Sequence, residues 1–184
     1  MTVVRIADYG AGNTLSVEVA FRRLRADVAV TDEPAQLAAA DLAVLPGVGS
    51  AASAMAGLRR RELDRALVER VAEGAPTLGI CLGLQLALEE TEEDGGVEGL
   101  GIVTGKATLL SEGRVPRIGW AAVDPGGEAY YFAHSYAAQT PDAVAFSEGV
   151  VAEVRHGSFT GVQFHPEKSA AAGARYLERC LSLV

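Results

Sequence analysis

The sequence predicts an α/β fold in which helices cover both faces of an open, mostly parallel sheet with an antiparallel extension. Two observations support this prediction. Before about residue 100, short aliphatic runs end in glycine or a polar residue and lead into helical stretches, as strands buried on both faces do. Beyond residue 100, shorter runs alternate with turn residues, which indicates hairpins or edge strands.

The elements follow in order along the chain. A strand over 3–7 leads through DYGAGN into a helix, because Val17, Ala20, Phe21 and Leu24 recur at helical spacing. Further strands are expected over 28–31, 41–47 and 75–81, and the last of these leads into a helix with the sequence LGLQLALEE. Hairpin or edge strands are expected within 107–110, 121–134 and 143–164, with turns at DPGG and RHGS. A closing amphipathic helix is expected from the apolar positions Ala170, Ala174, Leu177, Leu181 and Val184.

Composition narrows the class of protein. The 184 residues are 49% apolar and 22% charged, which predicts a single domain spanning 1–184. The net charge of −8 makes nucleic acid an unsuitable partner. We expect neither a membrane span nor a signal peptide, and therefore a cytoplasmic protein in which Cys81 and Cys180 are free thiols.

A cysteine between two glycines is the first candidate for chemistry. Cys81 lies where the strand PTLGI turns into a helix, so its thiol would project from a tight corner beside a helix N-terminus that favours the thiolate. We expect Gly79 and Gly83 to keep side chains away from the folded backbone and from the substrate's path. The alternative is a small buried cysteine in a glycine-kinked strand.

His165 is the best candidate for a base. Glu167 lies two residues further on, beyond Pro166, and in an extended segment residues i and i+2 point the same way, so the carboxylate can orient the imidazole. The alternative is a surface histidine beside a surface glutamate. His156 is expected to be a solvated turn residue, and His134 either lines the site or simply ends a strand.

The segment LPGVGS at 45–50 supplies a third element. Glycines at the carboxyl end of a strand let backbone N–H groups face outward, as an oxyanion hole requires. Cys81 and His165 would also lie at the carboxyl ends of strands, where sites of open α/β sheets form. The alternative is an ordinary turn between strand and helix.

Taken together, GICLGLQ, PGVG and VQFHPEK resemble the class I glutamine amidotransferases, a family with a flavodoxin-like fold. Within that family, DYGAGNTLSV, VPRIGW, YFAHSY and HPEKS resemble the glutaminase subunits of imidazole glycerol phosphate synthases. The resemblance implies that glutamine is hydrolysed to glutamate and ammonia without a cofactor. It also implies that the ammonia passes to a partner cyclase subunit with a (β/α)₈ barrel, in histidine biosynthesis.

The resemblance also implies roles for individual residues. Cys81 would be the nucleophile, His165 the general base and then acid, and Glu167 the orienting carboxylate. The oxyanion donors would be the N–H of Leu82 and that of Val48 or Gly49. Substrate would be bound by Gly47, Gln85, His134, Ser135 and Tyr136; the alternative for Gln85 is an exposed polar residue on a helix.

The partner-facing surface implied by the family includes the YGAGN loop, Asn13, Arg117, Trp120 and Lys168. Alternatively, Asn13 caps the first helix and Lys168 is solvated. For Trp120, a place in the core is expected about as strongly as a place at the interface. The chain departs from the family's usual PHxGWN, having Arg117 for histidine and Ala121 for asparagine, so polar contacts at the interface are expected to differ. Leu84 replaces a common methionine at little consequence.

Three alternative functions stay open. The chain could serve another synthase, of anthranilate, carbamoyl phosphate, purine or pyridoxal phosphate synthesis, which a pull-down of the native partner would reveal. It could be a non-catalytic interaction protein with a vestigial site, which would not show labelling of Cys81 by a glutamine-like electrophile. A cysteine hydrolase with a nucleophile elbow is disfavoured, because such enzymes place the acid before the histidine in the chain.

Overall fold

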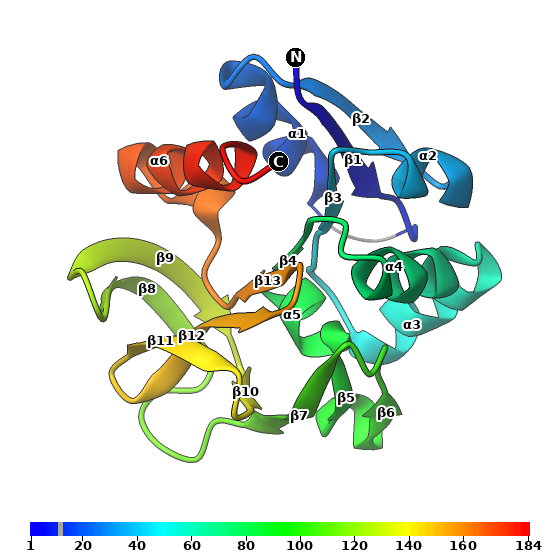
Figure 1. Ribbon diagram of the computed structural model, residues 1–184. Coiled ribbons are helices and arrows are strands. Elements are labelled where there is room, and N and C mark those ends of the chain that lie inside the picture. The colour runs from blue at the N-terminus through cyan, green and yellow to red at the C-terminus, as the bar shows by residue number, and fades with distance from the viewer. Residues whose placement is uncertain (11–12) are drawn as a thin grey trace.

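A seven-stranded sheet forms the centre of the computed structural model, which describes residues 1–10 and 13–184 (Figure 1). The strand order is β11-β12-β13-β4-β3-β1-β2. From β13 to β2 neighbouring strands are parallel, and β12 and β11 add antiparallel pairs at one edge, which confirms the predicted fold class. The bounds are β1 Val3–Ala7, β2 Asp27–Thr31, β3 Leu42–Leu45, β4 Thr77–Ile80, β11 Ala143–Ser147, β12 Val150–His156 and β13 Phe159–Val162.

Helices cover both faces of this sheet. In β3, Leu42 and Val44 pack with the helices of one face, α1 and α6, whereas Ala43 and Leu45 pack with α2, α3, α4 and α5 on the other. Successive side chains of a strand point to opposite faces, so a strand covered on both sides needs a continuous apolar run. The helices are α1 Thr14–Arg23, α2 Pro34–Ala38, α3 Ala51–Arg60, α4 Leu63–Ala72, α5 Leu82–Ala87 and α6 Ala170–Leu181.

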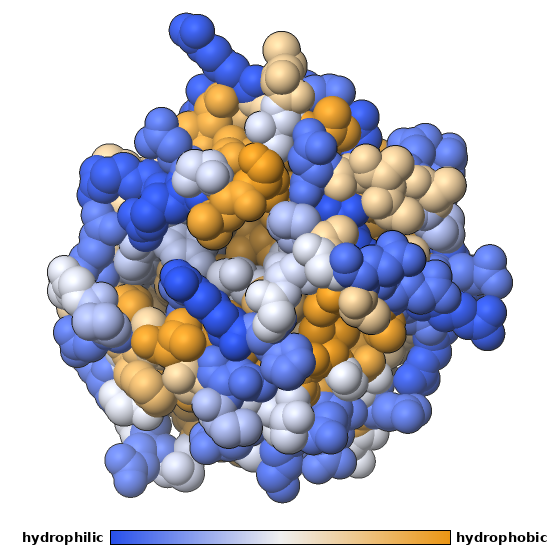
Figure 2. Space-filling model, in the orientation of Figure 1, coloured by the Kyte–Doolittle hydropathy of each residue, from blue (hydrophilic) through white to orange (hydrophobic). Residues whose placement is uncertain are grey.

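Two smaller sheets lie beside the antiparallel edge, in the green and yellow part of Figure 1. One has the order β10-β7-β5-β6, and the other is the β8–β9 hairpin, whose turn contains the predicted DPGG. In the same orientation, Figure 2 shows hydrophilic residues over much of the surface with hydrophobic patches between them. The bounds are β5 Leu88–Thr91, β6 Val97–Glu98, β7 Val103–Leu109, β8 Arg117–Val123, β9 Glu128–His134 and β10 Tyr136–Gln139, with 3₁₀ turns η1 Glu93–Gly95 and η2 Pro166–Lys168.

Two helix predictions were wrong in detail. The helix after Cys81 ends at Ala87 instead of continuing to Glu90, because Leu88 takes an extended conformation and β5 pairs with β7. In α6 the buried positions are Gly173, Tyr176, Leu177 and Cys180, whereas Ala170, Ala174 and Val184 are exposed. The prediction relied on aliphatic positions and therefore missed the buried face, which consists mostly of a glycine, a tyrosine and a cysteine.

Within residues 1–10 and 13–184, no helix is both long enough and apolar enough to cross a membrane.

Candidate active site

Cys81 occupies the sharp corner between β4 and α5. Its backbone has φ 53° and ψ −107°, and residues other than glycine rarely adopt a positive φ. A hydrogen bond to β13 fixes this corner, because the Cys81 N–H donates to the Val162 carbonyl at 2.7 Å and so continues the parallel pairing of β4 with β13. Cys81 is buried, with 6% of its surface exposed, and its sulfur lines a cavity.

The two glycines beside Cys81 serve the packing of the corner. A Cβ at Gly83 would lie 2.0 Å from the Leu45 carbonyl oxygen, and one at Gly79 would lie 2.9 Å from the Gly83 carbonyl oxygen. Neither glycine lines the cavity around Cys81. They therefore let α5 approach β3 and β4 closely, and the expectation that they also clear the substrate's path was wrong.

His165 and Glu167 form a buried pair next to this corner. The Nδ1 of His165 lies 2.9 Å from Glu167 Oε1, and both side chains are almost fully buried. Pro166 and Glu167 lie in the 3₁₀ turn η2, so the pair forms across a turn rather than along the extended segment that the sequence suggested. The backbone N–H of His165 donates to the Tyr131 carbonyl at 2.8 Å, which fixes the ring's position relative to β9.

Opposing effects determine the charge of His165. Burial favours the neutral ring and lowers the pKa of His165, but interactions with the Cys81 sulfur, when it carries negative charge, and with the Glu167 carboxylate outweigh burial and raise the pKa to about 9. Because Nδ1 faces the carboxylate, Nε2 is the nitrogen that remains for the thiol. The arrangement therefore holds a protonated imidazole between a sulfur and a carboxylate.

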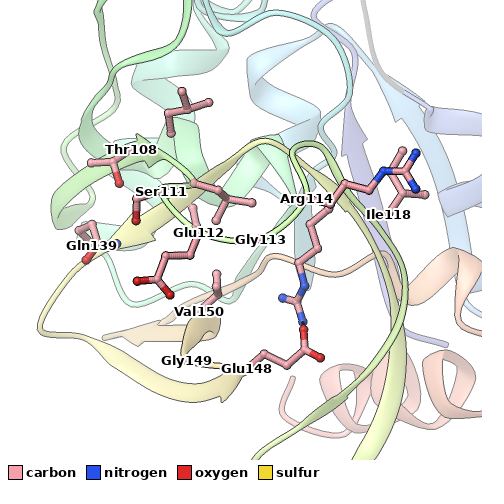
Figure 3. A pocket seen from close by; sticks show the side chains of 14 residues that line it. Thr108, Ser111, Glu112, Gly113, Arg114, Ile118, Gln139, Glu148, Gly149 and Val150 are labelled. Atoms are coloured by element: carbon pink, nitrogen blue, oxygen red, sulfur yellow. Dashed lines mark hydrogen bonds and ion pairs between the residues drawn. The ribbon is translucent and has the colours of Figure 1, made fainter.

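The cavity around Cys81 has a volume of about 280 Å³ and brings together most of the predicted site residues. Glu167 does not line it, since it lies behind the His165 ring. A larger hollow of about 670 Å³ lies on the other side of Ile118, lined by 108–114 and by Glu148 (Figure 3). Neither cysteine nor histidine lines that hollow, so the smaller cavity is the candidate active site. Its predicted lining residues are Gly47, Val48, Gly49, Cys81, Leu82, Gln85, His134, Ser135, Tyr136, His165 and Lys168.

His134 lines the cavity as a neutral ring. Its Nδ1 lies 2.9 Å from the Tyr136 carbonyl oxygen, which can only accept, so Nδ1 carries the proton and the buried Nε2 is bare. Burial, together with the positive charges of Arg117 and His165, lowers the pKa of His134 to about 4 despite that hydrogen bond. His156, in contrast, is exposed as expected, but it is the last residue of β12 rather than a turn residue, and its Nδ1 lies 3.1 Å from Asp142 Oδ2.

The loop of residues 46–49 runs from β3 to α3 above the corner. Tyr9 anchors it by donating its hydroxyl to the Pro46 carbonyl at 2.7 Å. A Cβ at Gly47 would lie 2.3 Å from the Gly83 N, so glycine is required where this loop contacts α5. Gly49 has φ +101° with open space around it. The loop therefore contacts the first turn of α5 directly.

Glu93 is a lining residue that the sequence analysis missed. It lies in η1, and its Oε2 accepts a hydrogen bond of 3.1 Å from the Ala51 N–H at the start of α3. The adjacent Asp94 accepts from Ser50 Oγ at 2.7 Å and from the Ala52 N–H at 3.0 Å. The only local signal is a run of acidic residues, and their position against α3 depends on the fold. Pro116, Ile118 and Ala133 were missed in the same way.

The residues predicted to face a partner lie in different surroundings. Trp120 is 54% exposed, so the alternative that places it in the core is wrong. Lys168 is exposed at the cavity's edge, and Asn13 makes no capping hydrogen bond through its side chain. Ala11 and Gly12 of the YGAGN loop lie outside the described residues.

Arg117 points inward rather than outward. It donates at 2.8 Å to both Ser147 Oγ and Glu148 Oε2, and its guanidinium lies 4.4 Å from the centre of the Phe132 ring. Its side chain is only 16% exposed. Arg117 therefore joins the β8–β9 hairpin to the β11–β12 turn.

Comparison with known proteins agrees with this arrangement. The class-I glutamine amidotransferase family matches residues 5–183. The chain is 41% identical to imidazole glycerol phosphate synthase subunit HisH of Symbiobacterium thermophilum, over 96% of this chain and 92% of that protein. It is 43% identical to the subunit of the same name from Exiguobacterium sibiricum, over 96% and 93%.

Solved structures share the fold at lower identity. A crystal structure of a glutamine amidotransferase superposes with a TM-score of 0.82 at 18% identity, covering 98% of both chains. The structure of PurLQS from Thermotoga maritima superposes with a TM-score of 0.78 at 17% identity, covering 100% of this chain and 99% of that one.

Proposed function

Because the chain belongs to the class-I glutamine amidotransferases and, within them, to the HisH subunits of imidazole glycerol phosphate synthase, we propose that it hydrolyses glutamine to glutamate and ammonia for histidine biosynthesis. One observation carries the proposal: Cys81 and His165, from separate parts of the chain, line the same cavity, and the Glu167 carboxylate lies 2.9 Å from the Nδ1 of His165. A nucleophile, a base and an orienting acid in this order are what acyl transfer requires. Anthranilate, purine and pyridoxal phosphate synthesis are less well supported, because the curated relatives compared are HisH subunits.

In the proposed reaction, the proton of Cys81 is already held by His165, and the Cys81 thiolate attacks the side-chain amide carbon of glutamine. His165 then gives the proton to the departing nitrogen as the carbon–nitrogen bond breaks, which leaves a glutamyl thioester and ammonia. A water molecule, deprotonated by His165, attacks the thioester and releases glutamate and the free thiol. Glu167 holds the ring in position and stabilises its charged form throughout.

The developing oxyanion needs donors, and two loops are placed to supply them. The N–H of Leu82 opens α5 directly after Cys81, and Val48 and Gly49 lie across the same cavity. In the described residues the Leu82 N–H has no backbone acceptor. Removal of one such donor typically slows turnover by two to three orders of magnitude.

The polar groups of the substrate are proposed to meet the cavity wall formed by residues 134–136. The backbone of His134, Ser135 and Tyr136 supplies peptide groups there, while Gln85 and Gly47 border the same space. Glu93 places a carboxylate at the cavity, which suits the α-ammonium group of glutamine.

We further propose a partner cyclase subunit with a (β/α)₈ barrel that receives the ammonia. The relatives are named as subunits of a synthase. Ile118, which lines the cavity, and Trp120, two residues further along β8, expose 64% and 54% of their surfaces. A cytoplasmic location suits the two free thiols, Cys81 and Cys180.

A coupled assay tests class, partner and ammonia transfer together. The chain is mixed with a candidate cyclase subunit, glutamine and the cyclase's nucleotide substrate, and formation of imidazole glycerol phosphate is followed. We expect product with glutamine for the natural chain and none for Cys81→Ala, whereas added ammonium salt should restore product in both. Product from glutamine with Cys81→Ala, or none with the natural chain, would overturn the proposal.

A further inference from the structure

A series of buried amides runs from the substrate-binding wall to the catalytic sulfur. The Gln85 side-chain amide donates to the Tyr136 carbonyl at 2.8 Å and to Gln163 Oε1 at 3.1 Å, and Gln163 Nε2 lies 3.5 Å from Cys81 Sγ. We propose that Gln163 is a further catalytic residue whose N–H holds the Cys81 sulfur as a thiolate, and that Gln85 positions it. This inference rests on the role proposed above for Cys81.

The direction of these hydrogen bonds follows from their first member. The Tyr136 carbonyl can only accept, so Gln85 must present its NH₂ group there. The second N–H of that group points to Gln163, which must therefore present its oxygen to Gln85. Gln163 is left with its own NH₂ group facing the sulfur, so the amide acts on Cys81 as a donor.

The sheet places Gln163 beside Cys81. In the parallel pair β13–β4, Val162 is opposite Ile80, and Cys81 then donates its backbone N–H to the Val162 carbonyl. The next residue on the β13 side is Gln163, whose backbone N–H donates to the Ala152 carbonyl at 2.9 Å. Gln163 is fully buried. An amide in this position is costly unless both of its ends are paired, which prevents it from turning away.

The sulfur needs this donor more after it loses its proton. As a thiol, Cys81 can donate to the Ala133 carbonyl, whose oxygen lies 3.8 Å from Sγ. As a thiolate it can only accept, and a carbonyl oxygen nearby becomes unfavourable. Gln163 is the residue among those described whose side-chain N–H donates a hydrogen bond to the sulfur. Its contribution should therefore be larger for the thiolate than for the thiol.

The pH dependence of Cys81 alkylation by iodoacetamide tests this inference on the full chain without substrate. Burial raises the pKa of the other thiol, Cys180, to about 12, so labelling near neutral pH reports on Cys81. Gln163→Met removes the amide at similar volume. Gln163→Glu keeps an acceptor for Gln85 but places a carboxyl group beside the sulfur. The matched control is Gln36→Glu on exposed α2.

We expect the midpoint of alkylation to move to a pH about one unit higher in both Gln163 variants and to stay in place in Gln36→Glu. Glutamine hydrolysis with the cyclase bound should fall about tenfold or more in kcat, with KM changed less than about threefold. A residue with only a structural role would lower the melting temperature and leave the alkylation midpoint unchanged.

If either Gln163 variant does not fold, Gln85→Met provides the second measurement. It leaves Gln163 in place but removes the partner that orients it, so the alkylation midpoint should again move upward. Unchanged midpoints in the folded variants would overturn the role of Gln163. Retained glutaminase activity in Cys81→Ala would instead overturn the proposed function, so the two failures are distinguishable.

Discussion

At the scale of single residues, the backbone of Cys81 is strained and the imidazole ring of His165 carries a positive charge. The left-handed backbone of Cys81 costs about 1–3 kcal/mol for a residue with a side chain. The hydrogen bond to Val162 and the close approach of Gly83 to Leu45 hold that conformation in place. This conformation lets Cys81 line the cavity although the residue packs in a buried cluster.

The raised pKa of His165 makes stability depend on pH. Its folded value of about 9 lies above the ordinary 6.5, so the charged ring stabilises the folded chain below pH 6.5 and this contribution is lost as the pH rises through 9. We expect the free energy of unfolding, from urea titration, to decrease by up to about 3 kcal/mol over that window. In Glu167→Gln the decrease should be clearly smaller, since the ring loses its carboxylate.

The surface histidine supplies the control for this prediction. His156→Gln changes a residue outside the cavity and should keep the full pH dependence. An equal decrease in Glu167→Gln and in the natural chain would show that the carboxylate does not stabilise the charged ring.

At the scale of elements, short segments are held by contacts with distant parts of the chain. The helix α5 has six residues, too few to be stable alone, and all of them are buried. The turn η1 supplies Glu93 and Asp94 to the N-terminus of α3, where backbone N–H groups lack partners within the helix. These contacts place the loop of residues 46–49 relative to Cys81.

Arg70 joins several elements through carbonyl groups alone. It lies 2% exposed in α4 and donates to the carbonyls of Leu37, Ala38, Asp41 and Pro76, around the C-terminus of α2 and the starts of β3 and β4. We expect Arg70→Met to lower the free energy of unfolding by about 3 kcal/mol, because five hydrogen bonds from a buried side chain to four carbonyl groups are lost. Chemical denaturation measures this change.

A neighbouring arginine on the same helix provides the matched comparison. Arg65 is 77% exposed, and Arg65→Met should change the free energy of unfolding by less than about 0.5 kcal/mol. Similar values for the two substitutions would mean that the carbonyl contacts of Arg70 contribute little.

At the scale of the whole molecule, the site forms where three neighbouring parallel strands end. The loop of residues 46–49 follows β3, Cys81 follows β4 and His165 follows β13, and these strands are adjacent in the order β13-β4-β3. Both core clusters use the strands of this sheet, which supports our proposal that 1–184 act as one domain. The carboxyl edge of the sheet is thus where segments distant in sequence can meet.

The exposed tryptophan of β8 yields a prediction about the partner. Trp120→Ala should weaken binding of the chain to the cyclase subunit by about tenfold or more, because large aromatic side chains dominate interfaces. Titration calorimetry measures the affinity. The control is Leu183→Ala, because Leu183 is 74% exposed and lies near the starts of β3 and β4, at the end of the sheet away from the cavity. This substitution should leave the affinity unchanged. Equal affinities for Trp120→Ala and the natural chain would place the interface elsewhere.

Sequence alone was sufficient for the features that depend on neighbouring residues. The corner at Cys81 follows from glycines on either side of a cysteine between a strand and a helix. The contact between His165 and Glu167 joins residues two apart, so few conformations of the fold could separate them.

Only the tertiary structure decided the features that depend on pairing between distant segments. The end of α5 at Ala87 follows from the pairing of β5 with β7, and the inward direction of Arg117 follows from Ser147 and Glu148 lying across from it. Gln163 contacts the sulfur because the register of β13 on β4 places it there. These contacts join residues 15 to 82 positions apart, and no local pattern specifies which distant segments will be neighbours.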